Sequence, residues 1–269
     1  MVNKEKFSRG SEKEHGKDIL ETRKKIIDVL NKELESNPNV KVAFLVGSDA
    51  QKKVDEYSDI DFDIVLDPES VEEIEKLVKS CLEKVSPIKT ELRRMTTKGA
   101  LQVIYQLEMS RFLRADVVFL PGIEYMDMTG PEIKILFDKD AIIKHKEPQE
   151  NELIEKIRKR IVGMEKYEEL RQTSLERELN RGNYLESIEK YYGLILETLV
   201  EALRLQYCPA KSEYYLKHIS RDLPKEVVKE IEDLYKVSSV DEIKEKNEKA
   251  SELLKQTLEE LKIKIQTKD

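Results

Sequence analysis

The sequence predicts an α/β (α+β) domain with a short mixed sheet, followed by an all-α helical bundle domain. In the first half of the chain, short apolar runs bounded by Gly, Pro and Asn alternate with helical periods, a pattern typical of strands and helices in one domain. From about Asn151 the strand-like runs disappear and long helical periods replace them. We therefore predict two domains, residues 1–146 and residues 147–269.

Two helices are predicted in the first domain. The first follows a polar segment, residues 1–16, and ends at the turn Asn37-Pro38-Asn39. The second begins with a capping box made by Ser70 and Glu73 and ends before Pro87. The apolar residues at helical spacing in the first are Ile19, Leu20, Ile26, Ile27, Leu30 and Leu34.

Short apolar or alternating runs predict the strands of this domain. A turn at Lys98-Gly99 separates two of them, and residues 144–148 are expected to be a linker. The predicted strands are residues 42–46, 60–66, 88–95, 101–107 and 112–121, with residues 135–137 as an edge strand.

The second domain is predicted to be a bundle of long helices. Its central helix begins near Tyr184 and is apolar on more than one side, and Ser239 with Glu242 forms a capping box at the start of the last helix. The predicted helices are residues 152–179, 184–206, 225–236 and 239–264.

The first candidate for a functional site is the pair Gly47-Ser48, which follows the first predicted strand. A glycine allows a sharp turn and lets a ligand approach the backbone closely. If Ser48 opens a short helix, its hydroxyl and the free amides of the first turn form an anion site.

Acidic residues then occupy alternate positions of the second strand. Because side chains alternate across a pleated strand, Asp59, Asp61 and Asp63 share one face. Carboxylates this close repel each other, so a cation is expected between them, and their hard oxygen atoms suit magnesium carrying a phosphate substrate. Asp61 paired with Asp63 is the alternative to Asp59 paired with Asp61.

A single carboxylate, Asp116, lies near the start of the apolar run 112–121. Burying a bare carboxylate is costly, so Asp116 must be paired, bound to a metal or exposed to solvent. A third metal ligand and an ion pair with Arg114 are both open.

Gly47-Ser48, followed by Tyr57-Ser58-Asp59-Ile60-Asp61, resembles the signature of the polymerase β-type nucleotidyltransferase superfamily, and is most similar to its aminoglycoside/lincosamide branch. The resemblance implies that Gly47 and Ser48 hold a nucleoside triphosphate, that Asp59 and Asp61 bind Mg2+, and that Asp116 is the third acid. It also implies a possible homodimer and a helical domain that supplies the acceptor pocket at a cleft between the halves. The further nucleotide contacts expected from it are Ser58, Lys52 and Lys211.

The sequence differs from this family next to the expected phosphates. Many members have an arginine where this chain has Gln51, and Asp49 adds a negative charge there. Lys52 and Lys53 are the cations expected to compensate for it.

Composition limits the possible partners. The net charge is -7 and the sequence pI is about 5.4, so nucleic acid is an unlikely partner, since affinity for phosphate backbones comes largely from clustered cations. Cys81 and Cys208 have no metal-type spacing and are expected to be reduced thiols in a cytoplasmic protein. There is no apparent export signal or membrane-spanning run.

Together these observations predict a magnesium-dependent nucleotidyltransferase. It would move a nucleoside monophosphate, AMP from ATP, onto a hydroxyl group of a small-molecule acceptor and release pyrophosphate, with Asp116 as the base. The alternatives are nucleotidylation of RNA or protein, and a catalytically silent module that binds a nucleotide or a partner.

Overall fold

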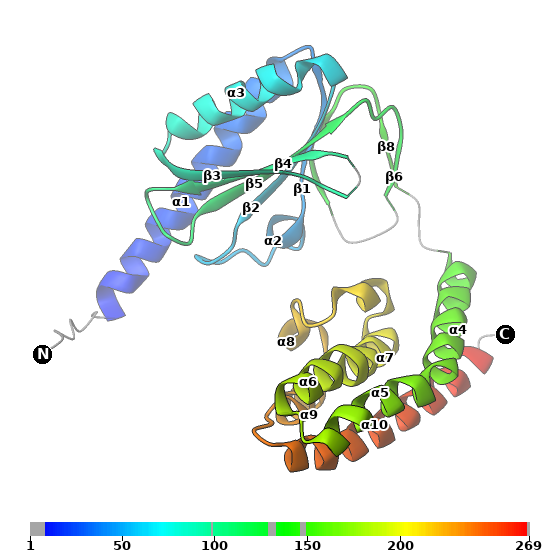
Figure 1. The fold of residues 1–269 in the computed structure, drawn as a ribbon. Helices are drawn as coiled ribbons and strands as arrows, with labels where there is room; N and C mark the ends of the chain where they lie inside the picture. Colours follow the sequence, from blue (N-terminus) through cyan, green and yellow to red (C-terminus); the bar gives the residue numbers. More distant parts are fainter. Residues whose placement is uncertain (1–8, 98, 129–132, 146–148, 268–269) are drawn as a thin grey trace, which may run out of the picture. The chain divides into compact units, whose positions relative to one another are not determined.

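The structure, a computed structural model, describes residues 9–97, 99–128, 133–145 and 149–267. The chain divides into two compact units, Met1–Lys146 and Glu147–Asp269. The first unit combines helices with a mixed sheet and the second is helical, so the predicted fold class is confirmed (Figure 1).

The main sheet of the first unit has the strand order β3-β4-β5-β2-β1-β7. Strands β2 and β5 are parallel and every other neighbouring pair is antiparallel, which makes the sheet mixed as predicted. The strands are β1 (Val40–Leu45), β2 (Ile60–Leu66), β3 (Ile88–Met95), β4 (Leu101–Leu107), β5 (Arg114–Pro121) and β7 (Lys134–Asp138). The edge strand predicted at residues 135–137 is β7.

A small parallel sheet that the sequence did not predict joins β6 (Met126–Met128) to β8 (Ile143–His145). The linker predicted at residues 144–148 is therefore wrong for its first two residues, which belong to β8. Its other three residues lie outside the described part of the chain, as does Lys98 of the predicted turn.

Two helices, α1 (Arg9–Ser36) and α3 (Val71–Glu83), cover one face of the main sheet (Figure 1). Ile60, Phe62 and Ile64 of β2 are fully buried in this core. Because the strand is pleated, the residues between them point to the opposite face. The pleat thus places Asp61 and Asp63 on the face opposite α1 and α3, which they share with a smaller buried apolar cluster that includes Phe44 and Val65.

The N-terminal ends of both helices differ from the prediction. Helix α1 begins at Arg9, so residues 9–16 are helical rather than loosely held, and residues 1–8 lie outside the described part. A 3-10 turn, η1 (Pro68–Ser70), precedes α3, and the Ser70 side chain makes no capping hydrogen bond. The capping box predicted there is wrong, because the turn already directs the chain into the helix.

The helical unit is more broken than the sequence periodicity suggests. The predicted helix 152–179 is interrupted at Tyr167, which has φ -102° and ψ 7°. The predicted helix 184–206 contains a π-helical stretch, η2, and Leu185 at its start is 74% exposed rather than packed in the bundle. The elements are α4 (Glu150–Lys166), α5 (Glu168–Arg181), α6 (Tyr184–Lys190), η2 (Tyr191–Leu196), α7 (Glu197–Tyr207), η3 (Pro209–Tyr214), α8 (Ile219–Asp222), α9 (Lys225–Leu234) and α10 (Val240–Gln266).

The centre of the helical unit is nevertheless the predicted one. Tyr191 is fully buried and its hydroxyl donates a hydrogen bond to the Leu234 carbonyl oxygen at 3.1 Å. At the start of α10 the Ser239 hydroxyl accepts a hydrogen bond from the Glu242 amide at 3.1 Å, which confirms this half of the predicted capping box. The Glu242 carboxylate accepts from the Ser238 amide at 2.7 Å rather than from the Ser239 amide.

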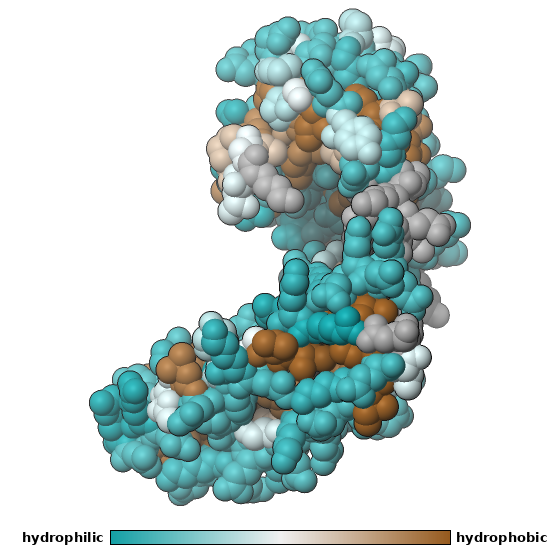
Figure 2. Space-filling model, turned by 90° about the vertical axis from the view of Figure 1, so that its right-hand side faces the viewer, coloured by the Kyte–Doolittle hydropathy of each residue, from teal (hydrophilic) through white to brown (hydrophobic). Residues whose placement is uncertain are grey.

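Hydrophilic residues cover most of the surface that Figure 2 shows, as expected for a chain in which 38% of the residues are charged. Every helix in the described ranges is either too short or too polar to cross a membrane. Both cysteines are free thiols.

Candidate functional site

Strand β1 leads into α2 (Gly47–Ala50), the short helix that the sequence predicts after the first strand. Gly47 has φ +63°, a left-handed conformation that favours glycine. A Cβ atom added to Gly47 would lie 2.2 Å from Oδ2 of Asp61. Two separate constraints therefore require glycine at position 47. One is the left-handed backbone conformation, and the other is the Asp61 carboxylate, which leaves no room for a Cβ atom.

The next residue, Ser48, carries a buried hydroxyl. Its Oγ atom has no hydrogen-bond partner within the described residues. A buried polar atom without a partner costs free energy, and such an atom beside a glycine turn is suited to a ligand. The turn predicted at Gly47-Ser48, called the cradle from here on, is thus present in the fold and contains an unsatisfied donor. Its role as an anion site stays a prediction.

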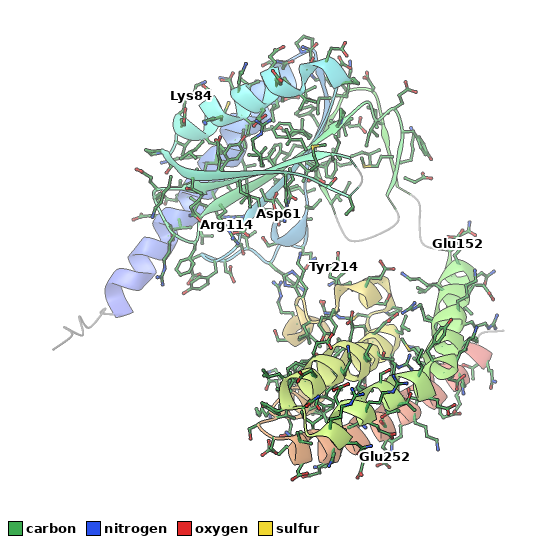
Figure 3. The ribbon with its side chains drawn as sticks, viewed as in Figure 1. Asp61, Lys84, Arg114, Glu152, Tyr214 and Glu252 are labelled. Atoms are coloured by element: carbon green, nitrogen blue, oxygen red, sulfur yellow. The ribbon has the colours of Figure 1, made fainter. Side chains whose placement is uncertain are left out.

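The parallel pairing of β2 and β5 brings two of the predicted acids together. Asp61 and Asp116 are direct partners in this register, whereas Asp63 faces Val118. All three carboxylates lie on the sheet face opposite α1 and α3, since they alternate with core residues. Asp61 lies at the end of the sheet that carries α2 (Figure 3).

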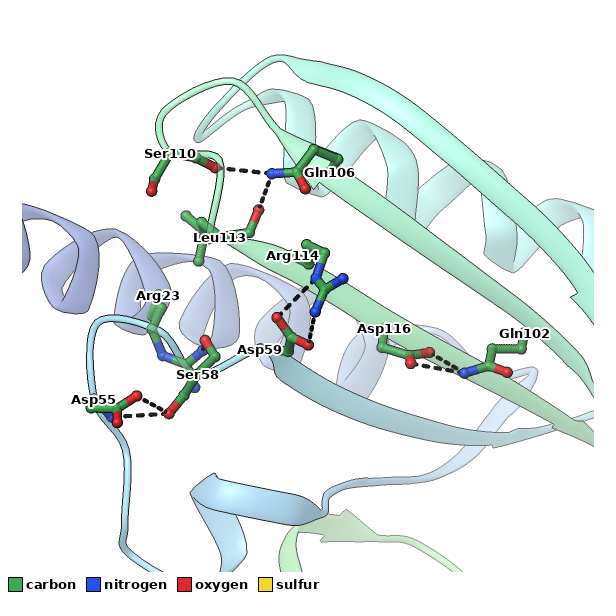
Figure 4. Close-up of polar contacts among 10 residues, drawn as sticks. All are labelled: Arg23, Asp55, Ser58, Asp59, Gln102, Gln106, Ser110, Leu113, Arg114 and Asp116. Atoms are coloured by element: carbon green, nitrogen blue, oxygen red, sulfur yellow. Dashed lines mark hydrogen bonds and ion pairs between the residues drawn. The ribbon is translucent and has the colours of Figure 1, made fainter. Parts of the chain in front are cut away.

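The other predicted metal ligand, Asp59, lies just before β2 and is paired with an arginine. Arg114 donates to both Asp59 carboxylate oxygens, at 3.0 Å from Nε and 2.7 Å from Nη2 (Figure 4). This hydrogen bonding raises the pKa of Arg114, as do the charges of Asp59, Asp116 and Asp61. The Arg114 guanidinium therefore interacts electrostatically with all three acids, but it forms its hydrogen bonds with Asp59.

The ion pair between Asp116 and Arg114 that the sequence allowed is thus wrong. Asp116 instead accepts two hydrogen bonds from Nε2 of Gln102, at 2.6 and 2.8 Å (Figure 4). Sequence reasoning missed Gln102. The signal for it was its polar position in the alternating strand β4, on the face that Asp116 shares.

Asp63 has a different environment from the other acids. Burial raises the pKa of Asp63 from 3.8 to about 7, and the charges of Asp61 and Asp116 add to the increase. The choice between the pair Asp59 and Asp61 and the alternative pair Asp61 and Asp63 as the metal ligands stays a prediction.

The donor set around Asp61 suits a magnesium ion but is not assembled. Within the described ranges, no group of three or more His, Cys, Asp or Glu side chains is arranged to hold a metal. The bidentate contact with Arg114 occupies the Asp59 carboxylate. Carboxylate oxygens are the ligands that Mg2+ prefers, so Asp59, Asp61 and Asp116 fit the predicted ion by chemistry once Asp59 leaves Arg114.

The charge of Asp49 is neutralised by a residue that sequence reasoning also missed. Arg23 of α1 pairs with the Asp49 carboxylate at 2.6 Å, and it is this residue, rather than Lys52 or Lys53, that compensates for Asp49. Arg23 also donates to the backbone carbonyl oxygen of Ser58 at 2.5 Å. Its position on an otherwise apolar helix face was the available signal.

Two of the predicted nucleotide contacts, Ser58 and Lys52, lie in the connection to β2, and Ser58 has a local role there. The Ser58 hydroxyl donates to Asp55 Oδ1 at 2.6 Å and accepts a hydrogen bond from the Asp55 amide at 3.0 Å, which closes the turn before Asp59 (Figure 4). Lys52 is exposed and has φ +55°.

Lys211 belongs to the helical unit. Its ammonium pairs with Asp222 at 2.7 Å, and Asp222 also pairs with the fully buried Arg204 at 3.2 Å. Its role as a nucleotide contact stays a prediction.

The helical unit contains a cavity of about 320 Å³ where α4, α7 and η3 meet. Ion pairs cross its wall, from Lys156 to Glu213 at 2.7 Å and from Arg160 to Glu201 at 2.5 Å. The Ser212 hydroxyl is buried without a hydrogen-bond partner in the part of the chain that is described. The remaining lining residues are Glu197 and Tyr215.

One family model matches part of the first unit. Residues 24–111 match the family model described as "Polymerase beta, Nucleotidyltransferase". No protein among those of curated function matches the chain.

Solved structures align over most of the chain. One is an aminoglycoside 6-adenyltransferase from Bacillus subtilis, with 15% identity, 89% of each chain covered and a TM-score of 0.36. Another is a STING-associated CdnE c-di-GMP synthase from Capnocytophaga granulosa, with 16% identity, 95% of this chain and 83% of that chain covered, and a TM-score of 0.30.

Replacing Gly47 by alanine should destabilise the protein more than replacing a glycine that has only the backbone constraint. Gly182, at the end of α5, has φ +72° but open space around its Cα, so Gly182→Ala is a matched control. We expect G182A to lower the free energy of unfolding by about 1 kcal/mol and G47A to lower it by about 1–3 kcal/mol more, because the new methyl group displaces Asp61. Urea unfolding checks this, and equal losses would contradict the contact.

Replacing Asp63 by asparagine should remove a pH dependence of stability. Between about pH 4 and pH 7 the folded protein keeps the Asp63 proton and the unfolded chain has lost it, so the free energy of unfolding falls as pH rises. With EDTA present, the free energy of unfolding of D63N should exceed that of the wild type by about 1–4 kcal/mol at pH 8. The two free energies should converge near pH 4, where the unfolded wild-type chain regains the Asp63 proton that the folded protein keeps. Denaturant unfolding across this range measures the difference. The exposed control D140N should keep the wild-type slope, and a D63N variant with that slope would contradict the assignment.

Proposed function

Residues 24–111 form a nucleotidyltransferase domain of the polymerase β family, and on this premise we propose that the protein transfers AMP from ATP to a hydroxyl group of a small-molecule acceptor. The chain is thus a nucleotidyltransferase, the enzyme class that the sequence predicts. The observation that carries the proposal is Asp61 paired in register with Asp116 beside the Gly47 turn.

The Gly47-Ser48 cradle is the proposed phosphate site. The Ser48 hydroxyl is the unsatisfied donor there, and a phosphate oxygen would accept its hydrogen bond. Gly47 lets this donor and Asp61 approach the same point. The β- and γ-phosphates would leave as pyrophosphate from this cradle.

Asp59, Asp61 and Asp116 would hold magnesium, which when bound neutralises charge on the triphosphate and lowers the pKa of the acceptor hydroxyl. Arg114 must release Asp59 for this set to assemble, because one carboxylate cannot serve the bidentate guanidinium and the metal in the same geometry. The binding of metal and the breaking of the Asp59–Arg114 pair are therefore coupled in this proposal.

Asp116 is the proposed base. It takes the proton of the acceptor hydroxyl as the acceptor oxygen bonds to the α-phosphorus and the bond from the α-phosphorus to the bridging oxygen breaks. Gln102 orients Asp116 through its two hydrogen bonds. Positioning of this kind supplies most of the rate gain in phosphoryl transfer.

The cavity of the helical unit is the proposed acceptor pocket. Its wall carries carboxylates, and the orphan hydroxyl of Ser212 gives a polar ligand a hydrogen-bond partner. Glu197 is an exposed carboxylate in the same lining. A hydroxyl-bearing polar molecule matches this chemistry better than an apolar one.

The experiment that tests the reaction is an incubation of the full chain with each of the four labelled nucleoside triphosphates and Mg2+. Candidate acceptors are pooled metabolites, aminoglycosides, lincosamides and tRNA, and mass analysis identifies the molecule that gains a nucleotide. Labelling of a small molecule supports the proposal, whereas labelling of RNA alone, or of nothing, contradicts it.

Loss of either central carboxylate should abolish transfer while the fold remains. We expect D116N to lower kcat by about 10²–10⁴-fold, because it removes a proton acceptor, and D61N to lower Mn2+ affinity as well as kcat. Steady-state kinetics and calorimetry with Mn2+ measure the two effects. The exposed control D140N should resemble the wild type, and a D61N variant with wild-type Mn2+ affinity would contradict the metal site.

Substitutions in the cavity should affect the acceptor alone. Once an acceptor is found, we expect S212A and E197Q each to raise its KM by about 3–30-fold, since each removes one polar contact. The KM for the nucleotide should stay constant. If acceptor KM values do not change in either variant, the acceptor binds elsewhere.

A further inference from the structure

A charged residue is buried at the contact between α1 and the sheet. Arg23 lies on the helix face that otherwise presents Ile19, Ile26 and Leu30 to the core, and it is only 2% exposed. A buried guanidinium is costly unless it is paired and hydrogen-bonded. Hydrophobic packing alone would be better served by an apolar residue at this position, so the charge needs another explanation.

The two acceptors of Arg23 belong to the two segments that form the candidate site. One guanidinium nitrogen donates to the Asp49 carboxylate at 2.6 Å, and Asp49 follows directly after the Gly47-Ser48 cradle. The other donates to the Ser58 carbonyl oxygen at 2.5 Å, and Ser58 directly precedes Asp59. A single side chain from a third element thus connects the cradle to the segment that carries Asp59, and Figure 4 shows Arg23 beside Ser58.

The pair with Asp49 also has an electrostatic consequence. The Asp49 side chain is 9% exposed and lies within α2, one residue from the unsatisfied Ser48 hydroxyl. A bare carboxylate at that place would repel the phosphates of a nucleotide, and partial burial would strengthen the repulsion.

We propose that Arg23 is a positioning residue of the nucleotide site, with two separable effects that both rest on the proposed function. Its charge cancels that of Asp49, so that the cradle accepts a triphosphate. Its hydrogen bond to Ser58 fixes the turn that delivers Asp59 to the metal. The first effect governs nucleotide affinity and the second governs turnover.

The two effects are separated by Arg23→Met, Asp49→Asn and the double variant, all made in the full chain. R23M leaves Asp49 charged and should weaken binding of the magnesium nucleoside triphosphates by about tenfold or more. D49N alone should keep or tighten this binding. The double variant carries neither charge and should recover affinity to within about threefold of the wild type.

The turnover of the double variant should stay low even though its affinity for the triphosphate recovers. The double variant still lacks the hydrogen bond to Ser58, so its kcat should stay at least about tenfold below that of the wild type. AMP carries less charge than a triphosphate, so R23M should weaken AMP binding less than triphosphate binding. Calorimetry gives the affinities with the four magnesium triphosphates and with AMP, and thermal unfolding reports the stability of each variant.

A merely structural role gives a different pattern. If Arg23 only stabilised the fold, the double variant would bind triphosphate as weakly as R23M, and that result would overturn the inference. If R23M does not fold, Arg23→Lys replaces it, because lysine keeps the positive charge but lacks the two-pronged geometry of the guanidinium. We expect R23K to bind the magnesium triphosphate with near wild-type affinity and to have a reduced kcat. Wild-type affinity together with wild-type kcat in R23K would equally overturn it.

The same measurements separate this inference from the proposed function. A wild-type chain that binds none of the four magnesium triphosphates overturns the proposed function, and the inference with it. A wild-type chain that binds one of them, with an affinity that R23M does not change, overturns the inference alone.

Discussion

The parallel pairing of β2 with β5 sets Asp61 opposite Asp116, and most of the polar structure around the site follows from the charge that this pairing concentrates. Carboxylates on adjacent strands repel each other unless cations or hydrogen-bond donors offset the repulsion. Burial raises the pKa of Asp63, and the charges of Asp61 and Asp116 add to the increase. Gln102 and Arg114 are the donors that the sheet places against it. The carboxylate oxygens of this arrangement are chemically suited to a magnesium ion.

The pleat of the sheet keeps stability and chemistry apart. The face that carries Phe62 is packed under α1 and α3, whereas the opposite face carries the carboxylates. Arg23 is the exception, because it is a charged residue in the packed layer. Its contacts reach Asp49 and Ser58, so the layer that holds the fold together also contacts both segments of the candidate site.

The helical unit depends on interruptions that periodicity does not reveal. The break at Tyr167 and the π-helical stretch Tyr191–Leu196 occur inside segments whose apolar spacing predicts continuous helices. The serine caps predicted from the sequence at the starts of two helices also had different outcomes. Ser239 caps α10 as predicted, whereas Ser70 does not cap α3, because a 3-10 turn replaces the expected geometry. Packing with neighbouring elements, rather than the sequence pattern of each helix, decided these details.

The sequence by itself determined the order of most strands and helices, the sharp turn at Gly47 and the alternation of acids on β2, because each depends on residues within a few positions of one another. Only the tertiary structure decided the partner of each charge. Arg114 pairs with Asp59 across 55 positions, and Arg23 pairs with Asp49 across 26. No local pattern encodes such contacts, since they arise only when strand register and helix packing bring distant segments together.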